Sequence, residues 1–143
     1  MLVRRGLAAL ERAERLGRSL GPYALQAAIA ACHGRARTAQ ETDWLQIVAL
    51  YDALLQLVPS PVVALNRAVA VGIAYGPAAG LEAIEDIRSE PALQGYYLLA
   101  SVRGDLLVRL GHLAEGRAEF RRAAHLTNNA RERAMLLARA SAP

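Results

Sequence analysis

The sequence is poor in the residues that build most catalytic, metal-binding and disulfide sites. Its one cysteine, Cys32, excludes an internal disulfide and a cysteine-based metal cluster. The histidines His33, His112 and His125 have neither the His-x-x-x-His nor the Glu-x-x-His spacing that places two metal ligands on one helix face. Cys32 and His33 are neighbours, and consecutive helix positions point about 100° apart, so they cannot act together as nucleophile and base. We therefore expect a non-enzymatic protein without a catalytic residue, a cofactor or a metal.

Lysine is absent: all 17 basic residues are arginines, and the formal net charge is +4. A basic chain suggests a nucleic acid as partner. However, Glu11 and Glu14 stand among the arginines of the first segment, and Glu115 and Glu119 stand beside those of residues 117–122. This spacing favours ion pairs along a solvated helix face rather than a row of unpaired cations. We expect no specific DNA binding by this segment.

Long apolar runs are also missing. No stretch of about 18 apolar residues without charges occurs, and the first residues soon give way to Glu11 instead of an apolar segment with a cleavage site. The sequence therefore predicts a cytoplasmic protein without a signal peptide and without membrane contact. Its 143 residues suffice for one hydrophobic core, so we expect a single domain over residues 1–143.

Glycine, proline and capping residues divide the chain into segments whose apolar residues recur every three or four positions, which is typical of α-helices. Ser60 and Pro61 mark one helix start, Thr42 is the expected N-cap of another, and Asn129 with Glu132 is expected to form a capping box. No stretch alternates with a period of two for long, so no sheet is expected. The predicted helices cover residues 2–16, 23–36, 43–58, 61–75, 77–87, 93–110, 113–126 and 130–140, with the polar stretch 37–41 interrupting the series.

Two helix pairs repeat along the chain. A shift of 104 − 68 = 36 positions pairs Ala68 with Gly104 and Ile84 with Phe120, and a weaker copy upstream follows at a shift of about 33. A period in this range predicts stacked antiparallel helix hairpins, a tetratricopeptide-like superhelix of seven to eight helices. We expect the small residues to let helices approach closely and the large ones to fill the space between them.

Some polar residues interrupt apolar helix faces, and they are our candidate partner contacts. Asn66 and Arg67 lie within the apolar helix that begins at Pro61, so they must find partners if buried. They either form a hydrogen-bond network between helices or contact a ligand or peptide in a groove, and both readings stay open. The full set of candidate groove contacts is Asn66, Arg67, Tyr75, Arg103, Asp43 and Tyr96.

Several blocks of this sequence resemble a known family. They are Gly21-Pro-Tyr-Ala-Leu-Gln-Ala-Ala-Ile-Ala-Ala-Cys-His33, Thr42-Asp-Trp44, Leu50-Tyr-Asp52, Pro59-Ser-Pro-Val-Val-Ala-Leu-Asn-Arg-Ala-Val-Ala-Val71, Gly76-Pro-Ala-Ala-Gly-Leu81 and Arg109-Leu-Gly111. In this order they resemble the C-terminal tetratricopeptide-like extension of extracytoplasmic-function (group IV) bacterial RNA polymerase sigma factors. The resemblance covers nearly the whole chain.

The resemblance implies a regulatory domain that modulates transcription initiation. Its implied partners are the sigma-factor domains of the same full-length chain and RNA polymerase, with a regulatory protein or peptide as a further one. The promoter-binding and core-binding domains of a sigma factor are not recognisable in these residues, which implies a detached extension.

Two alternatives remain open from the residues alone. The first is a free-standing tetratricopeptide-like adaptor for an unrelated partner. The second is a small-molecule-sensing helical domain, because an alanine-rich helical array can enclose an apolar pocket with a few polar groups.

Overall fold

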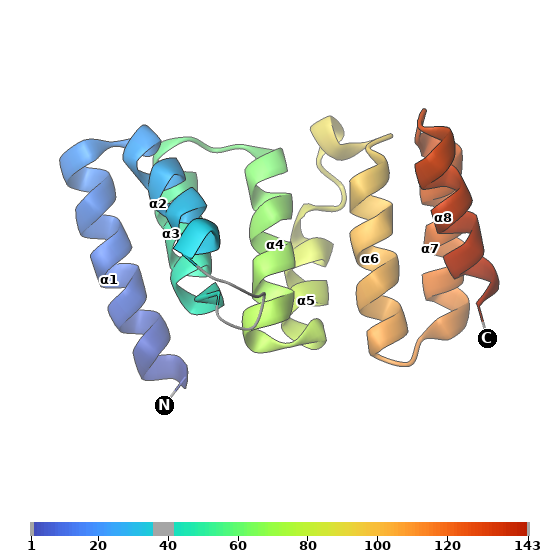
Figure 1. The fold of residues 1–143 in the computed structure, drawn as a ribbon, viewed down its shortest axis with the longest axis horizontal. Helices are drawn as coiled ribbons and strands as arrows, with labels where there is room; N and C mark the ends of the chain where they lie inside the picture. Colours follow the sequence, from blue (N-terminus) through green and yellow to red (C-terminus); the bar gives the residue numbers. More distant parts are fainter. Residues whose placement is uncertain (1, 36–41, 143) are drawn as a thin grey trace. The chain divides into compact units, whose positions relative to one another are not determined.

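The computed structural model describes residues 2–35 and 42–142, and these form eight α-helices, one short 3₁₀ helix and no strand (Figure 1). The predicted all-α class is confirmed. The elements are α1 (Leu2–Leu20), α2 (Pro22–Arg35), α3 (Trp44–Leu57), α4 (Pro61–Tyr75), α5 (Pro77–Ile87), η2 (Pro91–Leu93), α6 (Tyr97–Arg109), α7 (Leu113–Leu126) and α8 (Ala130–Ser141). The polar stretch 37–41, predicted to interrupt the helices, lies outside the described residues.

The repeat found in the sequence is visible in where the helices begin. The starts of α4 and α6 are 97 − 61 = 36 residues apart, and the starts of α5 and α7 are 113 − 77 = 36 apart. The weaker copy also holds, because α3 and α5 begin 77 − 44 = 33 residues apart. The predicted spacing of the helix pairs is therefore confirmed.

Three predicted helix ends are corrected. The first helix continues through Gly17 to Leu20, because the residue that stops it is Gly21, whose φ of 81° leaves the helical region. The sixth helix begins at Tyr97 rather than at residue 93, since Gly95 has a φ of 80° after η2. The N-cap of α3 is Asp43 instead of Thr42: the Asp43 carboxylate accepts a hydrogen bond of 3.1 Å from the backbone N–H of Gln46.

The cap of α8 is confirmed in part. The side chain of Asn129 accepts a hydrogen bond from the backbone N–H of Glu132, as predicted. The return bond of a capping box is missing, because the backbone N–H of Asn129 donates to the Thr127 hydroxyl, and that hydroxyl donates to the Glu132 carboxylate. The buried Thr127 thus relays the contact between the two ends of the predicted box.

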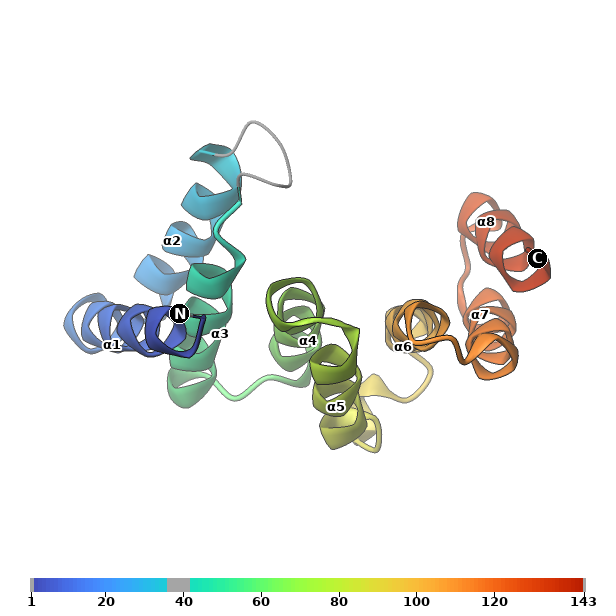
Figure 2. The same ribbon diagram turned by 90° about the horizontal axis from the view of Figure 1, so that it is seen from below.

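The chain divides into two compact units, and the first covers Met1–Ala74. In it α1 and α3 ascend in Figure 1 and α2 descends, steeply inclined to α1 in Figure 2. α1 packs mainly on α3, which is the most buried helix of this unit. The large side chains Leu25, Ile47, Leu50 and Leu54 are almost fully buried and form much of this core.

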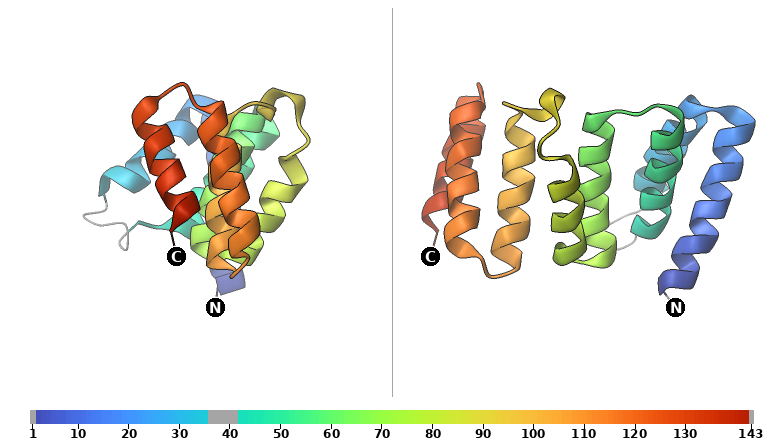
Figure 3. Two further views of the ribbon diagram at one scale, coloured as in Figure 1. Left: turned by 90° about the vertical axis from the view of Figure 1, so that its right-hand side faces the viewer. Right: turned by 180° about the vertical axis from the view of Figure 1, so that it is seen from behind.

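The second unit covers Tyr75–Pro143. Here α5 packs on α6, α6 most closely on α7, and α7 on α8, with consecutive helices running in opposite directions (Figure 3). The predicted stacked hairpins are confirmed. The prediction of a single domain over residues 1–143 stays a prediction.

Glycines allow α6 and α7 to cross closely. A Cβ atom added to Gly104 would lie 2.9 Å from the ring of Phe120 and 3.1 Å from the carbonyl oxygen of Gly116. A Cβ atom added to Gly116 would lie 2.6 Å from Val108 Cγ2 and 3.0 Å from the carbonyl oxygen of Gly104. Phe120 and Ile84 are both fully buried. The predicted roles, a close contact at Gly104 and filling residues at Ile84 and Phe120, are confirmed.

Candidate functional site

The second unit contains an open cavity of about 290 Å³. It is bounded by the segment that leaves α5, by the N-terminal half of α6, and by α7. This segment makes a wall because Pro91 begins the short turn η2 and Gly95 redirects the backbone toward α6. The polar wall consists of Arg88, Arg103, Arg122, Glu119, Ser89, Gln94 and Tyr96.

The charged side chains of this wall join Glu85, which does not line the cavity, in an ion-pair ladder across three helices. Glu85 of α5 accepts hydrogen bonds of 2.8 Å from both Arg88 and Arg103. Glu119 of α7 lies 3.7 Å from Arg103 and 3.7 Å from Arg122. The order of the ladder is therefore Arg88, Glu85, Arg103, Glu119, Arg122, and Arg103 of α6 is its central residue.

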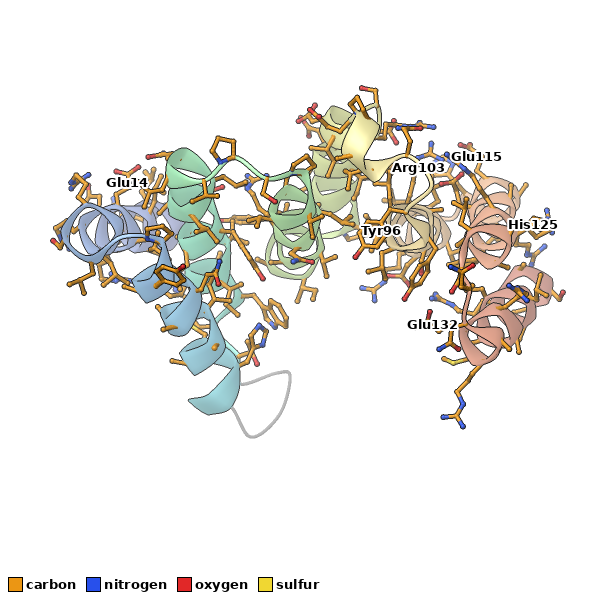
Figure 4. The ribbon with its side chains drawn as sticks, turned by 90° about the horizontal axis from the view of Figure 1, so that it is seen from above. Glu14, Tyr96, Arg103, Glu115, His125 and Glu132 are labelled. Carbon is orange, nitrogen blue, oxygen red and sulfur yellow. The ribbon has the colours of Figure 1, made fainter. Side chains whose placement is uncertain are left out.

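Glu85 and Arg103 perturb each other's ionisation. Partial burial tends to raise the pKa of Glu85, but hydrogen bonds from Arg103 and Arg88 outweigh it, so this pKa lies below its usual range. Burial tends to lower the pKa of Arg103, whereas its hydrogen bond to Glu85 and the charges of Glu119 and Glu115 raise it. Both groups are charged at neutral pH. Arg103 and Glu115 extend to the same side of the α6–α7 pair (Figure 4).

The floor of the cavity is apolar. Leu93, Leu99 and Ala100 are buried, and Leu126 is half-buried. Tyr96 stands at the start of α6, with its ring 6.2 Å from that of Tyr97 in an edge-to-face arrangement. The cavity thus combines guanidinium groups with an apolar surface.

A second feature, in the first unit, is an exposed apolar stripe on α4. Val62, Val69 and Ile73 are exposed, and Asn66 is exposed between them. The spacings of four, three and four residues place these side chains on one face of the helix. We call these four residues the α4 stripe.

The structure brings together two of the predicted contact residues. Tyr96 and Arg103 both line the cavity of the second unit. Asn66 lies in the α4 stripe, and Tyr75 is partly exposed at the end of α4. Whether any of these residues contacts a partner stays a prediction.

Two other candidates have structural partners. Arg67 forms an ion pair with Asp52 of α3, so this guanidinium ties α4 to α3. Asp43 caps α3. These contacts agree with the first of the two readings left open above, a hydrogen-bond network between helices, for Arg67.

Sequence reasoning missed Arg88, Arg122 and Glu119 as cavity residues. Glu85 with Arg88 and Glu119 with Arg122 are both Glu-x-x-Arg pairs, whose spacing indicates local ion pairs, and these pairs are present. What the spacing does not reveal is that Arg103 of α6 joins the two pairs. That junction depends on how α5 and α7 pack on α6.

Within the described residues, no group of three or more histidine, cysteine, aspartate or glutamate side chains is arranged to hold a metal ion. Nor is any described helix both long and apolar enough to cross a membrane. Cys32 is buried in the first unit.

Comparison with known proteins gives one informative match. No family model and no solved structure matches the chain. A protein of Rhizobium meliloti (strain 1021) bearing the name "Uncharacterized protein R00370" is 46% identical over 135 residues, which cover 94% of this chain. The same match covers 31% of the Rhizobium protein, so the chain spans about a third of the length of this relative.

Proposed function

We propose that this chain is a non-enzymatic regulatory module of a bacterial RNA polymerase sigma factor and modulates transcription initiation in the cytoplasm through protein contacts. The sequence blocks that resemble the tetratricopeptide-like sigma-factor extensions support this proposal, as does the stacked-hairpin fold. The Rhizobium relative, of which the chain spans about a third, has room for the additional domains that a sigma factor needs.

The α4 stripe is the observation that carries the proposal. A surface helix of a globular domain normally turns its apolar residues toward the core, whereas Val62, Val69 and Ile73 of α4 are exposed. Apolar side chains at successive turns of one helix are the usual anchors of helix-mediated protein contacts. The stripe also lies largely within the block of residues 59–71 that carries much of the resemblance.

The proposed partners are the sigma-factor domains of the same full-length protein and RNA polymerase. In this arrangement the α4 stripe packs against an apolar surface of one of them, and Asn66 supplies a hydrogen bond at its centre. Arg67 has a different part, because its ion pair with Asp52 holds α4 in place.

The proposal is tested by adding the chain as a separate protein and measuring both its binding and its effect on transcription. The chain is mixed with RNA polymerase core enzyme and with the remaining two thirds of the Rhizobium relative, and binding is measured by calorimetry alongside run-off transcription. We expect micromolar binding to one of them and a change in transcript yield. A double variant of the stripe, Val69→Ser with Ile73→Ser, is expected to weaken binding by at least about tenfold. A tenfold loss corresponds to about 1.4 kcal/mol of binding free energy.

The matched control is Leu7→Ser with Leu20→Ser, which removes two exposed leucines from α1 of the same unit. It is expected to change binding less than about twofold. No binding to either preparation overturns the sigma-factor proposal. Normal binding by the stripe variant refutes the placement of the contact on α4.

A second candidate function, small-molecule sensing, is favoured by one observation: the arginine-lined cavity of the second unit. A free-standing adaptor remains the alternative if the chain binds an unrelated protein instead of polymerase or sigma domains.

A further inference from the structure

We propose that the cavity of the second unit is a binding site for a small organic acid, a single carboxylate on a short apolar body. This site goes beyond the partner contacts proposed above and does not rest on them, because the α4 stripe belongs to the first unit and the cavity to the second. Three properties of the cavity support this proposal: its charge, the arginine N–H groups available as hydrogen-bond donors, and its size.

The charge of the ladder favours a monoanion. Three arginines and two glutamates leave a formal charge of 3 − 2 = +1. Glu115 also acts on Arg103, but its side chain is 62% exposed, so water screens its charge. Glu119 is buried and lines the cavity, and it repels a doubly charged phosphate more strongly than a carboxylate.

The arginines keep donors available for a ligand. Glu119 lies 3.7 Å from Arg103 and from Arg122, which is longer than a hydrogen bond, so it balances their charge without accepting their N–H groups at these positions. A guanidinium presents five donors in a planar fork that matches the two oxygens of a carboxylate. An incoming carboxylate therefore finds directed donors in a partly dehydrated wall.

The size and floor of the cavity define the rest of the ligand. A volume of about 290 Å³ lies at the lower end of small-molecule sites. Leu93, Leu99 and Leu126 offer an apolar surface to a short hydrocarbon chain or a single ring. Acids of about eight to ten heavy atoms fit this space.

The experiment compares matched ligands on the whole 143-residue chain. Hexanoate and benzoate are titrated by calorimetry and thermal melting at constant ionic strength, beside hexanamide, benzamide and inorganic phosphate. We expect both acids to raise the melting temperature and to bind at least about tenfold more tightly than their neutral amides, since charge-assisted hydrogen bonds are lost with the amides. Phosphate is expected to bind no better than the amides.

Two substitutions locate the site. Arg122→Gln removes a partly exposed guanidinium from the wall and is expected to weaken acid binding about tenfold. The control Arg121→Gln makes the same charge change at the neighbouring exposed position of α7, which does not line the cavity, and is expected to leave binding unchanged. Ser89→Trp, which fills the exposed rim without altering charge, is expected to weaken binding as well.

The outcomes separate the explanations. Equal binding of phosphate and the acids overturns the carboxylate assignment and indicates a general anion site. Equal losses in Arg122→Gln and Arg121→Gln indicate attraction by net charge alone and overturn the cavity as the site. Absence of any binding by hexanoate and benzoate overturns the proposal, whatever the result of the polymerase experiment.

Discussion

The two units hold their helices together by different means. In the second unit the tightest helix crossing is limited by backbone, since the carbonyl oxygens of Gly104 and Gly116 each lie near the place where the other residue would carry a Cβ. In the first unit the corresponding neighbours of Gly17 are side-chain ends: its added Cβ would lie 3.1 Å from Leu25 Cδ1 and 3.4 Å from Leu57 Cδ1. A leucine end can rotate, whereas a helix backbone cannot move without shifting the whole helix.

The polar contacts between helices are also more extensive in the second unit than in the first. The first unit links its helices through Arg67 with Asp52 and through a 3.3 Å hydrogen bond from Arg12 to Gln46. The second unit links its helices through the five-residue ladder. In addition, the guanidinium of Arg139 in α8 lies 4.2 Å from the centre of the Phe120 ring in α7. In the second unit a close glycine crossing and a continuous polar network thus occur together.

The largest effect is expected at Phe120. Phe120→Ala removes a ring that is 1% exposed, that covers Gly104 and that carries the Arg139 contact, so it should destabilise folding by about 3–5 kcal/mol. Urea unfolding followed by circular dichroism measures the loss. A loss below about 1 kcal/mol would contradict the packing described for α6 and α7.

Gly116→Ala tests the backbone-limited crossing. Its new methyl group would lie 2.6 Å from Val108 Cγ2 and 3.0 Å from a carbonyl oxygen, so α6 and α7 must separate at a cost of about 1–3 kcal/mol. Alanine's higher helix propensity, about 1 kcal/mol, offsets only part of this cost. Chemical denaturation gives the value, and a more stable variant would show that the crossing can relax.

The ion-pair ladder predicts a smaller, pH-dependent effect. The pKa of Glu85 is lower in the folded chain than its usual value of about 4.3, so its contribution is present above that pH and is lost as the pH falls through the folded pKa. Because the side chain is 40% exposed, Glu85→Gln should cost only about 0.2–1 kcal/mol at pH 7.

The measurement for Glu85→Gln is urea unfolding at neutral pH and at a series of lower pH values, where the difference from the parent chain should shrink as Glu85 becomes protonated. Glu82→Gln, on the exposed face of the same helix, serves as the control. A loss that persists unchanged at acid pH would assign the effect to packing instead of charge.

The last prediction concerns Gly17, a helix glycine of the first unit whose added Cβ would meet side-chain atoms only. Gly17→Ala gains about 1 kcal/mol of helix propensity inside α1 and meets a flexible leucine end, so the net change should stay within about 1 kcal/mol of zero. Thermal melting of both glycine variants side by side makes the comparison. If Gly17→Ala is as damaging as Gly116→Ala, the distinction between side-chain and backbone limits fails.

Much of the fold follows from local sequence signals. Pro61 and Pro77 begin helices, Asn129 caps α8, and the 36-residue shift marks Gly104 as a close-contact position and Phe120 as a filling residue. Less of the candidate site follows. The sequence pattern singles out Tyr96 and Arg103 but not Arg88 and Arg122, because ladders and cavities join residues that no local pattern relates.

Local sequence signals are enough to locate the helices and to identify residues that fill the close crossing of α6 and α7. Local propensity, caps and apolar periodicity act over a few residues, so they can be read along the chain. Tertiary packing adds that Arg67 ties α4 to Asp52 and that Arg103 joins two separate ion pairs beside a cavity. These outcomes depend on which helices pack together, since packing overrides local signals and brings distant charges within reach of one another.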